Sequence, residues 1–322
     1  MIMHHAAGLA AASLTFVDNA SDAMKPHDLP YPITDIHVHI QPWAQLHPQT
    51  RDVMAARRDN YEELQEMMLG PKAVLDAMDE AGVDRIGMIN YVATELMGFT
   101  DAVNPWCGKV AEAAPERLIA FGGLDPRDPK VIGDPEGAVD EAIDEHGLRG
   151  LKIHPPHQEF RANSYRPGAG DEHLPALAGI YQRCAERGMP VMIHTGTSIF
   201  PGARSRFGDP LECDDIGIDF PDLVQILAHA GRPFWCEQAL FVARRHPNLY
   251  VDLSGIPPSR LLHYLPGLQR IAHKCLWGTD WPGPGVPSLG GNLQQYLDLG
   301  LDEAVYRLTL NEVPEQLFPR SA

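Results

Sequence analysis

The sequence predicts a single-domain (β/α)₈ barrel, a TIM barrel, over residues 30–322, with long loops after its strands. From residue 33 onward, short apolar runs alternate with helical patterns until eight runs are complete, and strand–helix–strand units of this spacing pair in parallel. The 322 residues exceed the roughly 250 that eight such units typically need. Neither GxGxxG nor GxxxxGK(S/T) follows the first run, so a doubly wound open sheet is the weaker alternative.

The expected elements alternate in regular order along the chain. Strands are expected at residues 33–40, 85–91, 117–123, 148–154, 190–195, 224–230, 248–254 and 274–280. Helices are expected at 71–82, 101–114, 135–147, 174–188, 234–245, 259–271 and 292–318, the last as one helix or a pair. Three segments without a clear pattern, 41–70, 157–173 and 196–221, each follow a strand. We expect them to form the loops that build the catalytic face of the barrel.

Composition and charge exclude several classes of partner. Lysine and arginine number 26 and aspartate and glutamate 43, which gives a formal charge of −17. A chain this acidic repels nucleic acid and anionic membrane surfaces, and no apolar run reaches the about 20 residues of a membrane span. The five cysteines form no CxxC pair, which is typical of reduced thiols in a cytoplasmic protein. Residues 1–29 are expected to be a loosely attached extension rather than a secretory signal, because no lysine or arginine precedes their apolar stretch.

Residues that can bind a metal stand where the expected strands end. His37 and His39 are two apart on the first strand, so both imidazoles point to one side. His194, His229 and Asp280 close the fifth, sixth and eighth strands. Side chains at these ends of barrel strands read as catalytic, and imidazoles with one carboxylate suit zinc, or manganese or iron with a further oxygen ligand.

Several of these segments resemble one known family. DIHVH (35–39), RGLKIHP (149–155), MIHTG (192–196), ILAHAG (226–231) and LWGTDWP (276–282) are similar to motifs of the amidohydrolase superfamily. They most resemble its branch related to aminocarboxymuconate-semialdehyde decarboxylase, over residues 33–318. The resemblance implies one divalent ion, with zinc expected first, held by His37, His39, His194 and Asp280. It also implies that His229 activates water and steadies charge on the substrate.

The fourth strand and its neighbours leave alternatives open. Two-metal members of the superfamily carry a carbamylated lysine on this strand, where Lys152 stands. In the branch named above, the site resembles a one-metal centre without a bridging lysine. The preferred interpretation is that His154 lines the pocket and Lys152 below it supplies positive charge; a structural role for Lys152 is the other. Asp35 either orients an imidazole or anchors the barrel floor. Trp281, next to Asp280, is a candidate pocket wall.

The segment after the fifth strand predicts an anionic substrate. Arg204 and Arg206 are a basic spot in an acidic chain, and guanidinium groups suit carboxylates. A solvated loop or a dimer contact is the alternative. We therefore expect a metal-dependent hydrolase of a small carboxylate-bearing ester, lactone or amide. The alternative is a non-oxidative decarboxylase of a small aromatic or unsaturated acid, and a homodimer is expected because relatives are often dimers.

Overall fold

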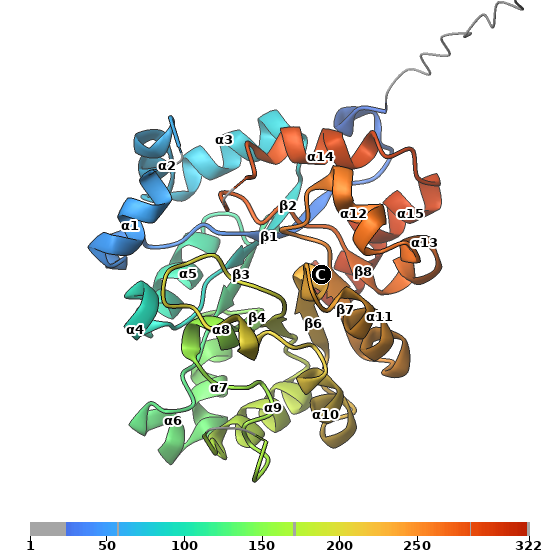
Figure 1. The fold of residues 1–322 in the computed structure, drawn as a ribbon. Coiled ribbons are helices and arrows are strands. Elements are labelled where there is room, and N and C mark those ends of the chain that lie inside the picture. Colours follow the sequence, from blue (N-terminus) through green and yellow to red (C-terminus); the bar gives the residue numbers. More distant parts are fainter. Residues whose placement is uncertain (1–23, 57, 170–171, 284, 321–322) are drawn as a thin grey trace, which may run out of the picture.

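The computed structural model describes residues 24–56, 58–169, 172–283 and 285–320. Eight parallel strands follow one another around a barrel in the order of the sequence (Figure 1). They are β1 (Thr34–Val38), β2 (Arg85–Ile89), β3 (Leu118–Gly122), β4 (Gly150–Ile153), β5 (Val191–His194), β6 (Gln225–Ala228), β7 (Leu249–Asp252) and β8 (Cys275–Leu276). The predicted fold class is confirmed.

Hydrogen bonds between β1 and the segment that follows β8 close the barrel. The Ile36 and His39 amides donate to the carbonyls of Trp277 and Trp281 at 3.1 and 2.7 Å. The Asp280 amide donates in return to the His37 carbonyl at 2.9 Å. The segment that carries Asp280 is thus hydrogen-bonded to β1 like a neighbouring strand, and these bonds fix its position.

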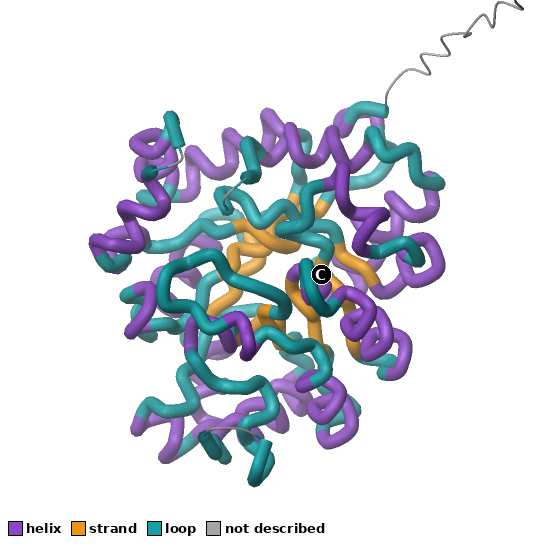
Figure 2. The backbone as a smooth tube through the Cα atoms, viewed as in Figure 1, coloured by secondary structure: helices purple, strands orange, loops and turns teal. Residues whose placement is uncertain are grey.

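Helices and loops surround the strands (Figure 2). The longer helices are α1 (Pro48–Ala55), α2 (Tyr61–Met67), α3 (Pro71–Ala81), α5 (Val103–Ala111), α7 (Pro135–Asp144), α9 (Ala176–Arg187), α10 (Glu212–Asp219), α11 (Cys236–Arg245), α12 (Pro258–Tyr264) and α14 (Leu289–Leu297). The shorter ones are α4 (Thr94–Met97), α6 (Pro129–Gly133), α8 (Pro155–Gln158), α13 (Leu268–Ile271), α15 (Glu303–Arg307) and α16 (Val313–Leu317). Single turns of 3-10 helix are η1 (Pro26–Asp28), η2 (Trp43–Gln45), η3 (Ser205–Phe207), η4 (His229–Gly231) and η5 (Ala272–Lys274), and η6 (Leu308–Glu312) is a π-helix.

Two apolar clusters hold these layers together. The larger one lies between the strands and the outer helices. The smaller one draws side chains from strands all round the sheet: Ile36, Ile89, Ile119, Phe121, Met192, Ile226, Ala228 and Leu276. Side chains from opposite strands can meet only inside the barrel, so this cluster fills its interior. Val313, in α16, and Phe318, just after α16, belong to the same cluster. They lie at the end of the barrel opposite the C-terminal ends of the strands.

The structure differs from the sequence-based expectation in several elements. The helix expected at 259–271 is two helices, α12 and α13, and the one expected at 292–318 is three, α14 to α16. The segment 196–221, expected to be a loop, contains α10, whose first turn is rich in acidic residues that favour a helix N-terminus. The strand expected at 274–280 is paired over only Cys275–Leu276, because the chain then turns to Asp280, which has a left-handed φ of 68°.

The described part of the expected extension lies against the barrel domain. Residues 1–23 fall outside the described residues. Met24 accepts a hydrogen bond at its carbonyl from Gln294 Nε2 of α14 at 2.9 Å, and η1 follows. Among the described helices, none has the length and apolar character that a membrane span requires.

Candidate metal centre

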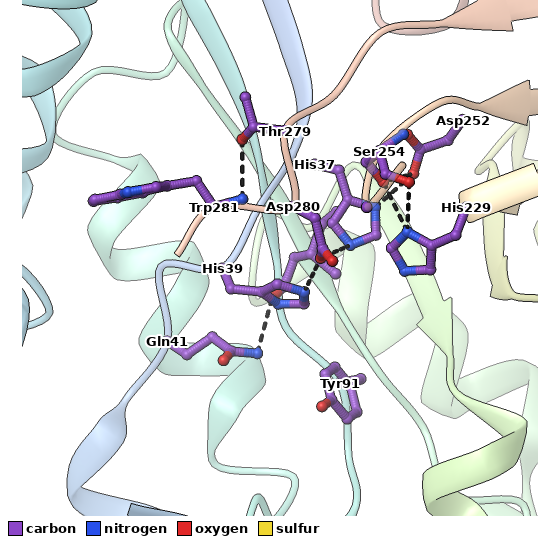
Figure 3. A network of polar contacts seen from close by, with 12 residues as sticks. His37, His39, Gln41, Tyr91, His229, Asp252, Ser254, Thr279, Asp280 and Trp281 are labelled. Carbon is purple, nitrogen blue, oxygen red and sulfur yellow. Dashed lines mark hydrogen bonds and ion pairs between the residues drawn. The ribbon is translucent and has the colours of Figure 1, made fainter. Parts of the chain in front are cut away.

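The residues predicted to hold the metal, and His229, predicted to act beside it, meet at the mouth formed by the C-terminal strand ends. His37 lies in β1 and His39 follows it, His194 ends β5, His229 follows β6, and Asp280 follows β8. The ring of His37 lies 5.0 Å from that of His39 and 4.8 Å from that of His229, and the rings of His194 and His229 are 4.7 Å apart. Asp280 Oδ1 lies 3.0 Å from His39 Nε2 and 3.6 Å from His37 Nε2 (Figure 3). The structure thus brings all five predicted residues together.

Three of the imidazoles share one kind of anchor, in which Nδ1 donates to an oxygen that can only accept. The pairs are His37 with Asp252 Oδ2 (2.6 Å), His39 with the Ile89 carbonyl (3.2 Å) and His229 with the Ser254 carbonyl (3.1 Å). Whenever such a ring is neutral, its proton lies on Nδ1 and its Nε2 is unprotonated. Bonds of this kind fix the tautomer and ring orientation of metal-binding histidines.

The remaining nitrogens fit a cation. His39 Nε2 lies 3.0 Å from Asp280 Oδ1, so a proton or a metal ion must lie between these two atoms. Within the described chain, His37 Nε2 and both ring nitrogens of His194 are buried without a hydrogen-bond partner. Ligand atoms of His37, His229 and Asp280 lie within 4.8 Å of one another. Buried lone pairs beside a carboxylate are the donor set that zinc and similar divalent ions prefer.

Protonation of these groups also suits metal binding. Burial, together with nearby positive charge, holds the pKa of His37, His194 and His229 well below the usual range. Burial alone would raise the pKa of Asp280, but the contact with His39 and the charge of Arg232 bring it below its ordinary value. At neutral pH His37, His194 and His229 are therefore neutral and the Asp280 carboxylate is ionised.

The backbone at the centre is held in unusual conformations by nearby strands. His229 and Asp280 have left-handed φ values of 67° and 68°, which cost non-glycine residues about 1–3 kcal/mol and persist where the surroundings impose them. Asp35 Oδ1 accepts from the amides of His37 (3.1 Å) and Thr279 (3.0 Å), so it ties β1 to the turn before Asp280. Of its two predicted roles, the contacts support the anchor.

Asp252 is a site residue that the sequence analysis missed. It ends β7, and besides His37 it accepts two bonds from Ser254, from the amide to Oδ1 and from Oγ to Oδ2, both at 2.8 Å. The signal was its position, because it closes a predicted strand as the candidate ligands do. Lys152 interacts electrostatically with the carboxylates of Asp252 and Asp280. Burial lowers the pKa of Lys152 to about 7, although these negative charges act to raise it. Its Nζ is buried with no partner among the described residues.

A stack of histidine rings borders the centre. The His154 ring lies 3.6 Å from that of His157 and 3.9 Å from that of His194, nearly parallel to both. His157 is held at both nitrogens, Nδ1 by Tyr91 Oη at 3.0 Å and Nε2 by Ser198 Oγ at 2.7 Å. His154 thus lies beside the centre, and its predicted role in lining the substrate pocket stays a prediction. The sequence did not predict His157 as a site residue, because it falls in a segment without periodicity. Tyr91 was not predicted either, because it is the last residue of the strand expected at 85–91.

The two arginines predicted to bind substrate lie on the surface of the loop after β5. The side chain of Arg204 is 57% exposed, and its Nε donates to Glu159 Oε2 at 3.1 Å. The Arg206 guanidinium lies 4.7 Å from the centre of the Phe207 ring. Trp281 is buried, and its carbonyl takes part in the barrel closure described above.

A third arginine, which the sequence analysis did not select, lies at the centre itself. Arg232 Nη2 is 3.6 Å from Asp280 Oδ2, and its side chain is 21% exposed. It follows His229 by three residues, so the signal was its distance along the chain from a strand end. The pattern alone gave no reason to prefer it to the other arginines.

An open cavity of about 990 Å³ lies next to the histidine stack. The loops that follow β2, β3 and β4 form it together with α7, and His157 and Gln158 form part of its wall. His157 therefore belongs both to the wall of the cavity and to the histidine stack. A cavity of this size takes a small organic molecule.

Comparisons with known proteins agree with this architecture. The model of the amidohydrolase family matches residues 34–320. No curated protein matches the chain. An uncharacterised TIM-barrel protein from Bordetella bronchiseptica is 19% identical, with a TM-score of 0.67 and coverage of 89% of this chain and 98% of that one.

Two further solved structures share the fold. The 5-carboxyvanillate decarboxylase of Sphingomonas paucimobilis is 16% identical, with a TM-score of 0.61 over 90% of this chain and 99% of that one. A putative 2-pyrone-4,6-dicarboxylic acid hydrolase of Pseudomonas putida is also 16% identical, with a TM-score of 0.57 over 90% and 98%.

Proposed function

Because the chain belongs to the amidohydrolase family, whose members are metal-dependent hydrolases or decarboxylases, we propose that it hydrolyses a small carboxylate-bearing ester, lactone or amide. One observation carries the proposal: three imidazoles anchored at Nδ1 lie with the Asp280 carboxylate at the mouth of the barrel, so their Nε2 atoms are left to bind an ion. Such a set binds an ion and leaves acid–base groups beside it.

We propose a single divalent ion, zinc before manganese or iron, held by His37, His39, His194 and Asp280. His194 supports this choice because both its nitrogens are buried and need a partner. A bound divalent ion activates water and polarises a carbonyl oxygen. His229 is the alternative fourth ligand, since its ligand atom lies within 4.8 Å of those of His37 and Asp280.

The roles of the chain's own groups follow from their protonation. Asp280 is ionised at neutral pH and can accept the proton of the attacking water and pass it to the leaving group. A neutral His229 presents an unprotonated Nε2, so it is better suited to accept a hydrogen bond from that water than to donate one to an oxyanion. Positive charge from Arg232 and Lys152 would stabilise negative charge developing on the substrate.

Non-oxidative decarboxylation is the second candidate. Decarboxylation is the activity named for the Sphingomonas protein, and an ion held by the same residues could bind a substrate carboxylate. The buried amine of Lys152 favours it to the extent that an amine with a pKa of about 7 can deliver a proton near neutral pH.

Turnover with isotopic water separates the two reactions. The zinc-loaded protein should be assayed on carboxylated lactones, esters and amides, and separately on aromatic carboxylic acids with detection of CO₂. Hydrolysis predicts incorporation of ¹⁸O from water into the product acid and no CO₂, and Asp280→Asn should lose about 100- to 10,000-fold of this activity, as removal of a catalytic acid–base group does. His263→Ala, an exposed histidine on α12, is the control. Release of CO₂ without ¹⁸O incorporation would replace hydrolysis by decarboxylation.

A further inference from the structure

We propose that Arg232 binds the carboxylate group of the substrate and so selects anionic substrates. The proposal deepens the proposed function and rests on it, because it names the group that recognises the substrate at the same centre. It also moves this role away from Arg204 and Arg206.

The guanidinium of Arg232 is held on two edges by backbone carbonyls. Its Nε donates to the Gly255 carbonyl at 2.5 Å and its Nη1 to the Thr197 carbonyl at 3.0 Å. Those carbonyls belong to the loops after β7 and β5, so two barrel strands position one side chain. A guanidinium carries five N–H donors in a rigid plane. The remaining nitrogen, Nη2, lies 3.6 Å from Asp280 Oδ2.

Gly255 makes room for this arrangement. It has a φ of 66°, and a Cβ built on it would lie 2.6 Å from Arg232 Nη2 and 2.9 Å from His229 Nδ1. Residue 255 therefore has to be a glycine for both side chains to keep their places. The same short segment positions His229 through the Ser254 carbonyl and Arg232 through the Gly255 carbonyl.

Burial and charge distinguish Arg232 from the other two arginines. Its side chain is largely shielded from water, whereas Arg204 is exposed and already paired with Glu159. The contact with Asp280 is longer than a hydrogen bond, which leaves Nη2 able to bind an incoming carboxylate. An anion held there would lie next to Asp280 and thus next to the reacting group. Charged hydrogen bonds of this kind change kcat/KM by about 10- to 150-fold when one partner is removed.

The test compares anionic and neutral ligands in Arg232→Met, Arg232→Gln and Arg232→Lys. Arg204→Met and Arg206→Met are the matched controls. On a carboxylated substrate, Arg232→Met should lose about 10- to 150-fold of kcat/KM, with a smaller loss on the neutral amide analogue that has the same reacting bond. Arg232→Lys should recover part of the preference for the anion, because it restores the charge without the planar fork.

A binding measurement keeps the proposal independent of the reaction. Calorimetry on the metal-loaded protein should show isophthalate binding about 10-fold or more weaker to Arg232→Gln than to the natural chain, with isophthalamide nearly unaffected. This comparison holds even if the enzyme proves to be a decarboxylase or no ester is hydrolysed. Equal losses for anionic and neutral ligands would make Arg232 a positioning residue for Asp280 and overturn the proposal. So would an unchanged isophthalate affinity in the Arg232 variants, or a selective loss in Arg204→Met or Arg206→Met.

Discussion

At the scale of single residues, the ligand-type side chains could be predicted from the sequence, whereas the groups that orient them could not. His37, His39, His194, His229 and Asp280 stand at strand ends, and parallel strands bring their ends together. Asp252 and Arg232 also lie at or near strand ends, but their contacts with His37 and Asp280 join residues far apart in the chain, and no local pattern encodes those contacts. Arg204 and Arg206 were selected by local charge, which does not say which way a loop side chain points.

Asp252 gives the first prediction. Asp252→Asn should weaken metal binding by about 10- to 100-fold, because the bond at 2.6 Å to His37 Nδ1 loses its charge and the ring its fixed orientation. The measurement is a competition titration with a chromophoric chelator. Asp214→Asn is the matched control, since Asp214 pairs with His246 at 2.7 Å in the same chemical way but away from the centre. Equal affinity in Asp252→Asn and the natural chain would remove Asp252 from the site.

The division of roles between His194 and His229 is the second prediction. His37→Ala and His194→Ala should each lower metal content at least tenfold after dialysis, because removal of a direct ligand exceeds the roughly 10- to 100-fold effect of an outer contact. His229→Ala should keep its ion and lose turnover. Elemental analysis of protein purified without chelator decides the matter. Metal loss in His229→Ala with retention in His194→Ala would exchange the two roles, and two ions per chain with a modified Lys152 would contradict the one-ion centre.

At the scale of elements, hydrophobic periodicity predicted the strands and most helices, and it failed where the chain turns within an apolar stretch. The expected helix 259–271 is interrupted around Pro266, because proline has no backbone N–H to continue the helical hydrogen bonds. In contrast, α10 formed within a segment that seemed patternless, because only Cys213, Ile216 and their neighbours face the core. Its buried Glu212 could not be recognised as structural from the sequence.

Glu212 gives the third prediction, a pH dependence of stability. Arg161 Nη1 and the Ala162 amide contact its carboxylate at 2.6 and 2.9 Å, yet burial outweighs them and raises its pKa from 4.5 to about 7. A raised folded-state pKa means that stability is fully present below the unfolded value and is lost as the pH rises through about 7. Relative to Glu212→Gln, the natural chain should therefore lose up to about 3 kcal/mol of unfolding free energy between pH 4.5 and 7.

Urea denaturation of both proteins at several pH values measures this difference. Glu186→Gln is the control, because Glu186 is an exposed carboxylate on the neighbouring α9. Parallel stability curves for Glu212→Gln and the natural chain across this range would show that Arg161 keeps the carboxylate ionised.

At the scale of the whole molecule, the barrel class followed from the count and order of the strands, and its closure through Asp280 and His37 followed from no sequence rule. The net charge and the expected homodimer concern the outer surface of the protein. The homodimer stays a prediction. The boundary of the domain is the feature of this scale that the described contacts define most sharply. Residues 24–29 contact α14 and lie beside the C-terminal end of α3, where Pro26 and His27 face Gly82.

A stepwise removal of the N-terminal residues tests that boundary and is the last prediction. A chain that begins at Met24 keeps the bond from Gln294 and the packing of Pro26, His27 and Leu29. We expect its Tm to stay within about 2 °C of the full chain and its metal content to be unchanged, because the sequence of residues 1–23 shows no core pattern and termini of this kind contribute little to stability. A chain that begins at Tyr31 loses these contacts, about 1–2 kcal/mol, and should melt about 2–8 °C lower. Calorimetry on the three proteins gives the answer. A large drop for the Met24 chain alone would show that residues 1–23 pack against the barrel or a second copy, and equal Tm values for all three would place the domain boundary after Leu29.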